Sequence, residues 1–194
     1  MKKLIALAVA SAFLLTGCAA NDPLAQQYKA GDNKNYIAGD GTVREFAPEN
    51  RGKAIEWSGT TETGGVLKSS QLTGVVVVMN FWYAGCAPCR AEAPDLVALN
   101  REFVGQKVQF IGVNVRDSAA TAAAFERKFG IVWPSLIDAN TGSVLLSFTG
   151  VVTPQAVPTT LVIDGKGRVS ARILGRIEKG TLKALIKTAV SENK

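Results

Sequence analysis

Histidine is absent from the 194-residue sequence, and cysteine is scarce, with only three copies. The absence of histidine excludes a Ser-His-Asp triad and a Cys-His nucleophile pair. It also disfavours zinc, because a structural site needs four protein ligands and the chain has no second Cys-x-x-Cys. Carboxylates would have to complete any metal site at the cysteines, and we expect no metal and no cofactor.

No stripe or cluster of basic residues is present, although Lys and Arg outnumber Asp and Glu by 22 to 16. Scattered positive charge indicates a solvated surface, and no nucleic acid is expected as a partner. Hydrophobic residues make up 47% of the chain and charged residues 20%, which is enough apolar material for a globular core.

The apolar stretch at the N-terminus, Leu4 to Leu15, is too short for a transmembrane helix and follows a basic start. This pattern is typical of a secretory signal. The tetrapeptide Leu15-Thr16-Gly17-Cys18 resembles the bacterial lipobox, which implies a signal peptide over residues 1–17 and lipid attachment at Cys18. The protein is then expected outside the cytoplasm, lipid-anchored to the bacterial cell membrane. The alternative is an ordinary signal peptide that is cleaved nearby.

The segment after Cys18 is polar and rich in Gly, Asn and Asp, without a sustained apolar period. We predict a lipidated linker over residues 18–50 and a folded domain over residues 51–194. In the alternative reading, residues 36–37 or 43–46 pack on the domain.

The pattern of the domain alternates strands and helices and ends in a hairpin and a helix. The Asp164-Gly165-Lys166-Gly167 turn gives the hairpin signal. We predict an α/β fold with a mixed sheet flanked by helices, an N-terminal β extension and a central insertion. Strands are expected at 54–60, 66–67, 75–81, 108–115, 135–138, 160–163 and 168–174, and helices at 69–72, 87–103, 118–129, 141–148 and 178–190.

Residues 75–81 form a continuous apolar run, which predicts a central strand buried on both faces. Two of the three cysteines, Cys86 and Cys89, follow this strand and are separated by Ala87 and Pro88. A structural staple is one interpretation, but a loop this short constrains the unfolded chain very little. A redox pair fits better, because Cys86 falls at the start of a helix, where backbone N–H groups and the helix dipole favour a thiolate. Cys89 lies one turn further, on the same side of the helix.

The stretch "NFWYAGCAPCRAEAPDL" resembles the active-site segment of thioredoxin-like proteins. It is most similar to the extracytoplasmic thiol–disulfide oxidoreductases of the TlpA/ResA type. Further agreement lies in "SQLTGVVVVMNFW", "VQFIGVNVRD", "AAFERKFGIVWPSLID" and "AVPTTLVIDGKGRV", so the resemblance covers residues 51–192.

This resemblance implies that Cys86 is an exposed attacking thiol and that Cys89 resolves the mixed disulfide. It implies a cis peptide bond at Pro158, with the backbone of Val157 positioning the substrate. It also places Trp82 beside the site, although a core aromatic is an equally good reading.

Two departures from thioredoxins stand out. Gly85 replaces the tryptophan that commonly precedes the first cysteine, and Asn80 replaces the buried aspartate that accepts a proton. Glu92 is then the best candidate for the proton acceptor of Cys89, although a solvated helix-face carboxylate is an open alternative.

The resemblance implies an enzyme that reduces extracytoplasmic protein disulfides, with apocytochrome c as the leading substrate. Its electrons would come from a transmembrane thiol carrier. A thiol oxidase is a second hypothesis, and a redox or metal-binding module on the same fold is a third. A copper-delivering module is disfavoured, because such relatives use wider-spaced cysteines and a histidine.

Overall fold

The computed structural model describes residues 42–152 and 156–193. The predicted signal peptide, Cys18 and most of the predicted linker lie outside these residues. No helix in the described part is long and apolar enough to cross a membrane.

A six-stranded mixed sheet forms the centre of the domain, in the order β1-β8-β7-β4-β5-β6. The inner strand β4 runs parallel to β5 and antiparallel to β7, while β5 and β6 are parallel. The hairpin β7-β8 and the pair β1-β8 are antiparallel. The bounds are β1 Val43–Glu45, β4 Val76–Trp82, β5 Val108–Asn114, β6 Ser135–Ile137, β7 Thr159–Ile163 and β8 Val169–Leu174.

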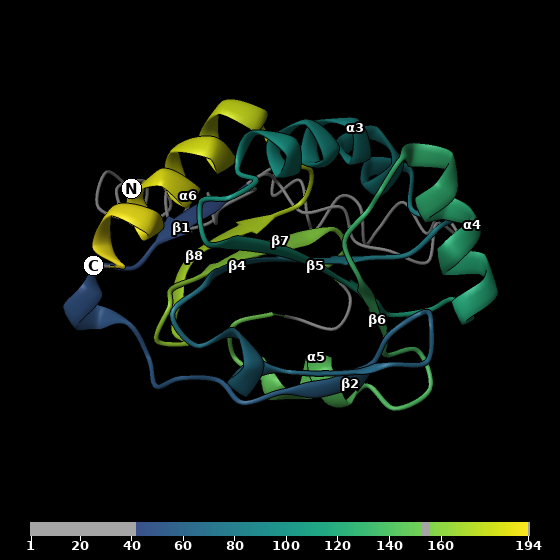
Figure 1. The fold of residues 1–194 in the computed structure, drawn as a ribbon, viewed down its shortest axis with the longest axis horizontal. Coiled ribbons are helices and arrows are strands. Elements are labelled where there is room, and N and C mark those ends of the chain that lie inside the picture. The colour runs from purple at the N-terminus through teal and green to yellow at the C-terminus, as the bar shows by residue number, and fades with distance from the viewer. Residues whose placement is uncertain (1–41, 153–155, 194) are drawn as a thin grey trace, which may run out of the picture. The chain divides into compact units, whose positions relative to one another are not determined.

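Helices cover both faces of this sheet, as Figure 1 shows. The long helices α3 and α6 lie on one face, and α5 lies on the other together with the separate hairpin β2-β3. The remaining bounds are η2 Pro48–Asn50, β2 Ser58–Thr60, β3 Val66–Lys68, η3 Ser69–Leu72, α3 Ala87–Glu102, α4 Ala119–Phe129, α5 Ser143–Ser147 and α6 Lys179–Glu192. The predicted β extension is the β2-β3 hairpin, and the predicted insertion contains α5.

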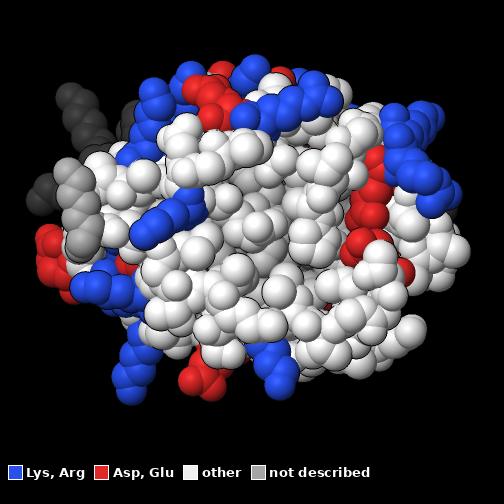
Figure 2. All heavy atoms as spheres, viewed as in Figure 1, with Lys and Arg blue, Asp and Glu red and all other residues white. Residues whose placement is uncertain are grey.

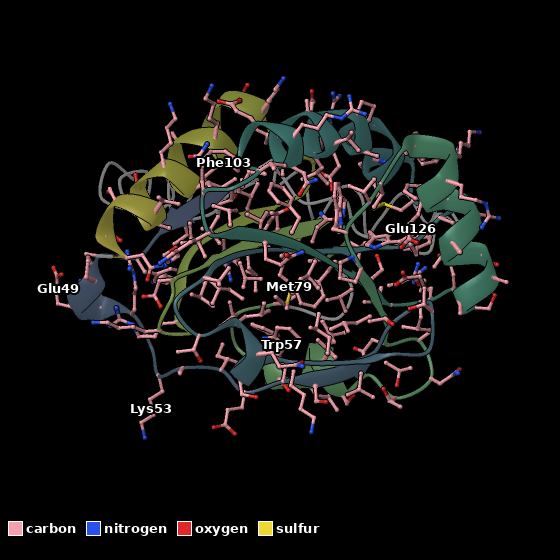
Figure 3. All side chains as sticks on the ribbon, viewed as in Figure 1. Glu49, Lys53, Trp57, Met79, Phe103 and Glu126 are labelled. Atoms are coloured by element: carbon pink, nitrogen blue, oxygen red, sulfur yellow. A yellow bond between two sulfur atoms is a disulfide. The ribbon has the colours of Figure 1, made fainter. Side chains whose placement is uncertain are left out.

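The core has two main layers because every residue of β4 is buried and successive side chains point to opposite faces. Val76 and Val78 pack against α3 and α6, whereas Val77, Met79 and Phe81 pack toward α5 and the extension. In Figure 3, Met79 and Trp57 lie on the α5 side of the sheet, and Phe103 lies on the α3 and α6 side. The buried apolar run therefore became the central strand, as predicted.

The N-terminal boundary differs from our prediction. Residues 43–45 form β1 and pair with β8, so the folded unit begins before residue 51, in line with the alternative reading of residues 43–46. The Arg51 side chain fixes this region, because it donates to Asp164 at 3.2 Å and to Glu192 at 2.5 Å. The predicted strand at 54–60 is confined to Ser58–Thr60, since Ile55 instead donates its N–H to Gly167 in the hairpin turn.

Charged side chains of both signs are interspersed around the rim of the face shown in Figure 2. This agrees with the scattered charge in the sequence. The centre of the same face is uncharged.

Candidate active site

The two cysteines are joined by a disulfide at the N-terminus of α3, with an S–S distance of 2.03 Å. Cys86 is the N-cap residue of the helix, and its Sγ accepts the backbone N–H of Cys89 at 3.2 Å. After reduction, this N–H and the positive end of the helix dipole would both stabilise a thiolate at Cys86. The arrangement therefore favours Cys86 as the nucleophile of the pair.

The loop before Cys86 is held from both sides. The N–H of Ala84 donates to Asp117 Oδ2 at 2.6 Å, and Asn114 Nδ2 donates to the same oxygen at 2.8 Å. On the other side, Arg90 Nη1 donates to the carbonyl of Ala84 at 3.3 Å. These bonds tie the turn that carries Cys86 to the end of β5 and to α3.

The peptide bond between Val157 and Pro158 is cis, as the resemblance implied. Val157 is buried in the same apolar cluster as Cys86 and Cys89. The chain fold therefore brings the loop before β7 to the disulfide, although about 70 residues separate the two in the sequence.

Trp82 belongs to this apolar cluster as well. Its ring lies 4.4 Å from the ring of Phe125, and Phe125 in turn packs on Phe129 at 4.4 Å. Trp82 is therefore buried beside the site. It is both a core aromatic and a neighbour of the cysteine pair, so the two interpretations of this residue are compatible.

Glu92 is fully buried, with 0% of its surface exposed, so the reading of a solvated helix-face carboxylate is wrong. The reason is that this face of α3 packs on the sheet and on the segment before α6. The carboxylate accepts Asn80 Nδ2 at 2.8 Å and the N–H of Ile177 at 2.9 Å. Burial raises the pKa of Glu92 to about 7, and these two hydrogen bonds oppose that rise.

Asn80 connects Glu92 to the cysteines. Its amide donates to Glu92 Oε1 and to Thr160 Oγ1, and it also lines a small cavity together with Cys89, Trp82 and Phe125. The position that holds an acid in thioredoxins is thus occupied by an amide that orients the neighbouring carboxylate. A buried acid with a pKa near neutrality, hydrogen-bonded to an amide residue that lines the cavity at Cys89, is suited to exchange a proton at that site.

Cys86 was expected to be exposed, but it is 0% exposed in this disulfide state. Its sulfur is bonded to Cys89 and packs in a cluster with Tyr83 and Val157. The exposed residues next to it are Gly85 and Ala87, which lack bulky side chains. The exposed residues that flank Cys86 in the chain are therefore small.

The sequence did not single out Asp117, Asn114, Arg90 or Arg116 as site residues. Ser118 caps α4 by accepting the N–H of Thr121, so its neighbour Asp117 is not used as the cap. The free carboxylate of Asp117 instead binds the active-site loop. The order of two adjacent capping residues does not reveal which of them turns back toward another loop, so the sequence offered no signal for this contact.

No group of three or more potential metal ligands of the types His, Cys, Asp and Glu occurs within residues 42–152 and 156–193. The chemistry that the site itself offers is that of one dithiol/disulfide pair, one buried acid and one cis-proline loop. A mixed sheet with a Cys-x-x-Cys at a helix start opposite a cis-proline defines a thioredoxin-like thiol–disulfide site.

Comparison with known proteins agrees with this class. The model of the AhpC/TSA family matches residues 51–172, and the chain belongs to this family. The chain is 33% identical over 109 residues to the thiol:disulfide interchange protein HelX of Rhodobacter capsulatus, covering 56% of the chain and 57% of that protein. It is 29% identical over 116 residues to the thiol-disulfide oxidoreductase ResA of Bacillus subtilis, covering 60% and 62%.

Among solved structures, a DsbF homologue from Corynebacterium diphtheriae superimposes with a TM-score of 0.67 and 31% identity. The similarity covers 77% of this chain and 94% of that chain. The thioredoxin-like fold and the predicted similarity to the ResA type are thereby confirmed. The chain spans about three fifths of the length of the two named relatives, HelX and ResA.

Proposed function

We propose that this protein is an extracytoplasmic thiol–disulfide oxidoreductase that reduces protein disulfides through Cys86 and Cys89. The observation that carries the proposal is the disulfide at the N-cap of α3, in one apolar cluster with the residue before a cis-proline. The names of HelX and ResA support the same reaction class. Apocytochrome c is the substrate that the resemblance to the ResA type suggests.

The proposed reaction begins with the reduced pair. The Cys86 thiolate attacks one sulfur of the substrate disulfide, which forms a mixed disulfide and releases one substrate thiolate. Cys89 loses its proton and attacks Cys86 Sγ. The Cys86–Cys89 disulfide forms, and the second substrate thiolate leaves. Two electrons pass to the substrate, and a transmembrane dithiol carrier would restore the reduced pair.

Glu92 is the proposed proton acceptor for Cys89. Its burial and its pKa of about 7 suit a group that must take up a proton and give it back near neutral pH. Asn80 is a positioning residue in this scheme, because it donates to Glu92 Oε1 and also lines the cavity at Cys89. Val157 and Pro158 would receive the substrate backbone, and Trp82 would support the floor of the site.

An equilibrium titration against thiol–disulfide buffers tests the direction of the reaction. A reductase is expected to titrate as one two-electron couple with a midpoint at or below that of glutathione-type buffers, about −220 to −260 mV. The measurement is the fraction of alkylated Cys86 and Cys89 at each buffer ratio. A midpoint near that of strong oxidants, about −120 mV, would overturn the reductase assignment and favour the thiol oxidase.

Membrane attachment through Cys18 is a separate part of the proposal and rests on the lipobox-like tetrapeptide. Cys18→Ala in the full chain is expected to move the protein from the membrane fraction to the soluble fraction, because the acyl chains supply the anchor. Fractionation followed by detection of the protein is the measurement, with Cys86→Ala as the matched control that stays on the membrane. Retention of the Cys18→Ala variant would contradict lipidation.

A further inference from the structure

The exposed charges that border the disulfide are mostly positive. Arg90 lies one residue after Cys89, Arg116 lies in the turn after β5, and Lys128 lies near the end of α4; all three are exposed. The Arg116 guanidinium stands over the ring of Tyr83 at 4.5 Å from its centroid. The Arg90 guanidinium and the Lys128 amine stand over Phe129 at 5.4 and 6.0 Å.

These contacts hold the cations in place without neutralising them. A ring face attracts a cation but carries no net charge, so the positive charge stays available to a partner. The ion pairs of the described chain use other cations, namely Arg51, Arg168, Arg176 and Lys183. Arg90 instead donates to the carbonyl of Ala84, which fixes its position relative to the disulfide.

The acidic groups around the loop do not balance these cations. Asp117 accepts two hydrogen bonds at its Oδ2, from Ala84 and Asn114, and is the one partly exposed carboxylate bonded to the loop in the described chain. Glu92 and Glu126 are buried. Three exposed cations therefore face one engaged carboxylate at the border of the disulfide.

We propose that Arg90, Arg116 and Lys128 form a recognition surface for an acidic, extended protein segment whose cysteine reacts with Cys86. The apolar cluster that contains Trp82, Tyr83 and Val157 lies next to this surface. Because the surface is positively charged, the segment would carry Asp or Glu beside its cysteine. This inference rests on the proposed function and specifies the chemistry of its substrate. Cations at the border of a site accelerate the encounter with acidic partners more than they change the chemical step.

Single-turnover reduction of three disulfide-bonded peptides by the pre-reduced full chain tests the proposal. The peptides differ only in the residues that flank the cysteine, which are all Asp, all Ser or all Lys. At low ionic strength the Asp peptide is expected to react about tenfold faster than the Lys peptide, and this ratio should fall toward one at about 0.5 M salt, because exposed charges are screened.

The Arg90→Gln/Arg116→Gln variant is expected to bring the Asp-to-Lys ratio to about two or less at low salt. The ratio is the readout, since any loosening of the loop slows both peptides alike. Arg101→Gln/Lys187→Gln removes the same net charge at exposed positions of α3 and α6 away from the disulfide, and it should keep the wild-type ratio.

Three results would overturn the inference. Equal rates for the three peptides would show that the surface does not recognise charge. An unchanged ratio in the Arg90→Gln/Arg116→Gln variant would show that other residues do so. A failure to reduce any peptide, the Ser peptide included, would remove the proposed function itself and this inference with it.

Discussion

Glu92→Gln is expected to slow the step in which Cys89 attacks Cys86 by about 100-fold at neutral pH, the lower end of what a positioned proton acceptor contributes. Glutamine cannot take up the Cys89 proton, while the shape of the side chain is kept. The wild-type rate should fall as the pH is lowered through about 7, since Glu92 becomes protonated there. The variant should lose this dependence.

The same substitution has a second effect, on stability. The pKa of Glu92 is raised to about 7 in the folded chain from an ordinary value of 4.5, so folding favours the protonated acid. The stabilisation is fully present below pH 4.5 and is lost as the pH rises from 4.5 to about 7. At about 1.4 kcal/mol per pKa unit, the Glu92 carboxyl alone lowers the stability of the wild type by about 3 kcal/mol over this range, and Glu92→Gln should remove this contribution.

Denaturant unfolding and single-turnover kinetics across pH 4 to 8 measure the two effects of Glu92→Gln. Glu102→Gln is the matched control on the same helix, because its carboxylate is solvent-accessible and paired with Lys183. The control should keep the wild-type rate and the wild-type stability slope over pH 4.5 to 7. An unaltered pH–rate profile in Glu92→Gln would show that another group accepts the proton.

The sequence was sufficient to predict the order of the strands and helices and to identify Cys86 and Cys89 as the redox pair. Continuous apolar runs predicted β4 and β5, and the helix predicted to end at residue 129 does end there, followed by Gly130 with its positive φ of 72°. These features depend on neighbouring residues along the chain. The cis bond before Pro158 was implied by the family resemblance rather than by local preference.

Contacts between distant segments were not predictable in the same way. The burial of Glu92 depends on Asn80 from β4 and on Ile177 from the segment before α6, which lie 12 and 85 residues away. The hydrogen bond from Ala84 to Asp117 likewise joins two loops that meet only in the folded sheet. From sequence alone, a polar residue on a helix is predicted to be exposed to solvent, because the hydrogen-bond partners that allow its burial are not visible there.

Cys89→Ser is expected to abolish turnover and to leave the natural substrate covalently attached to Cys86. Serine keeps the size of the side chain, but its hydroxyl cannot attack the mixed disulfide, so the first intermediate accumulates. Cys86→Ser should remove the attacking thiolate and accumulate nothing. Both variants keep the surrounding apolar cluster, and both should fold.

The central claim is that Cys86 attacks and Cys89 resolves, and the composition of the trapped adduct tests it most directly. Cells that carry the full-length Cys89→Ser chain are quenched with acid and alkylated, and the adducts are digested and analysed by mass spectrometry. We predict a substrate peptide joined by a reducible disulfide to the peptide that contains Cys86. Adducts from Cys86→Ser but not from Cys89→Ser would reverse the two roles, and adducts from neither variant would contradict a redox function for the pair.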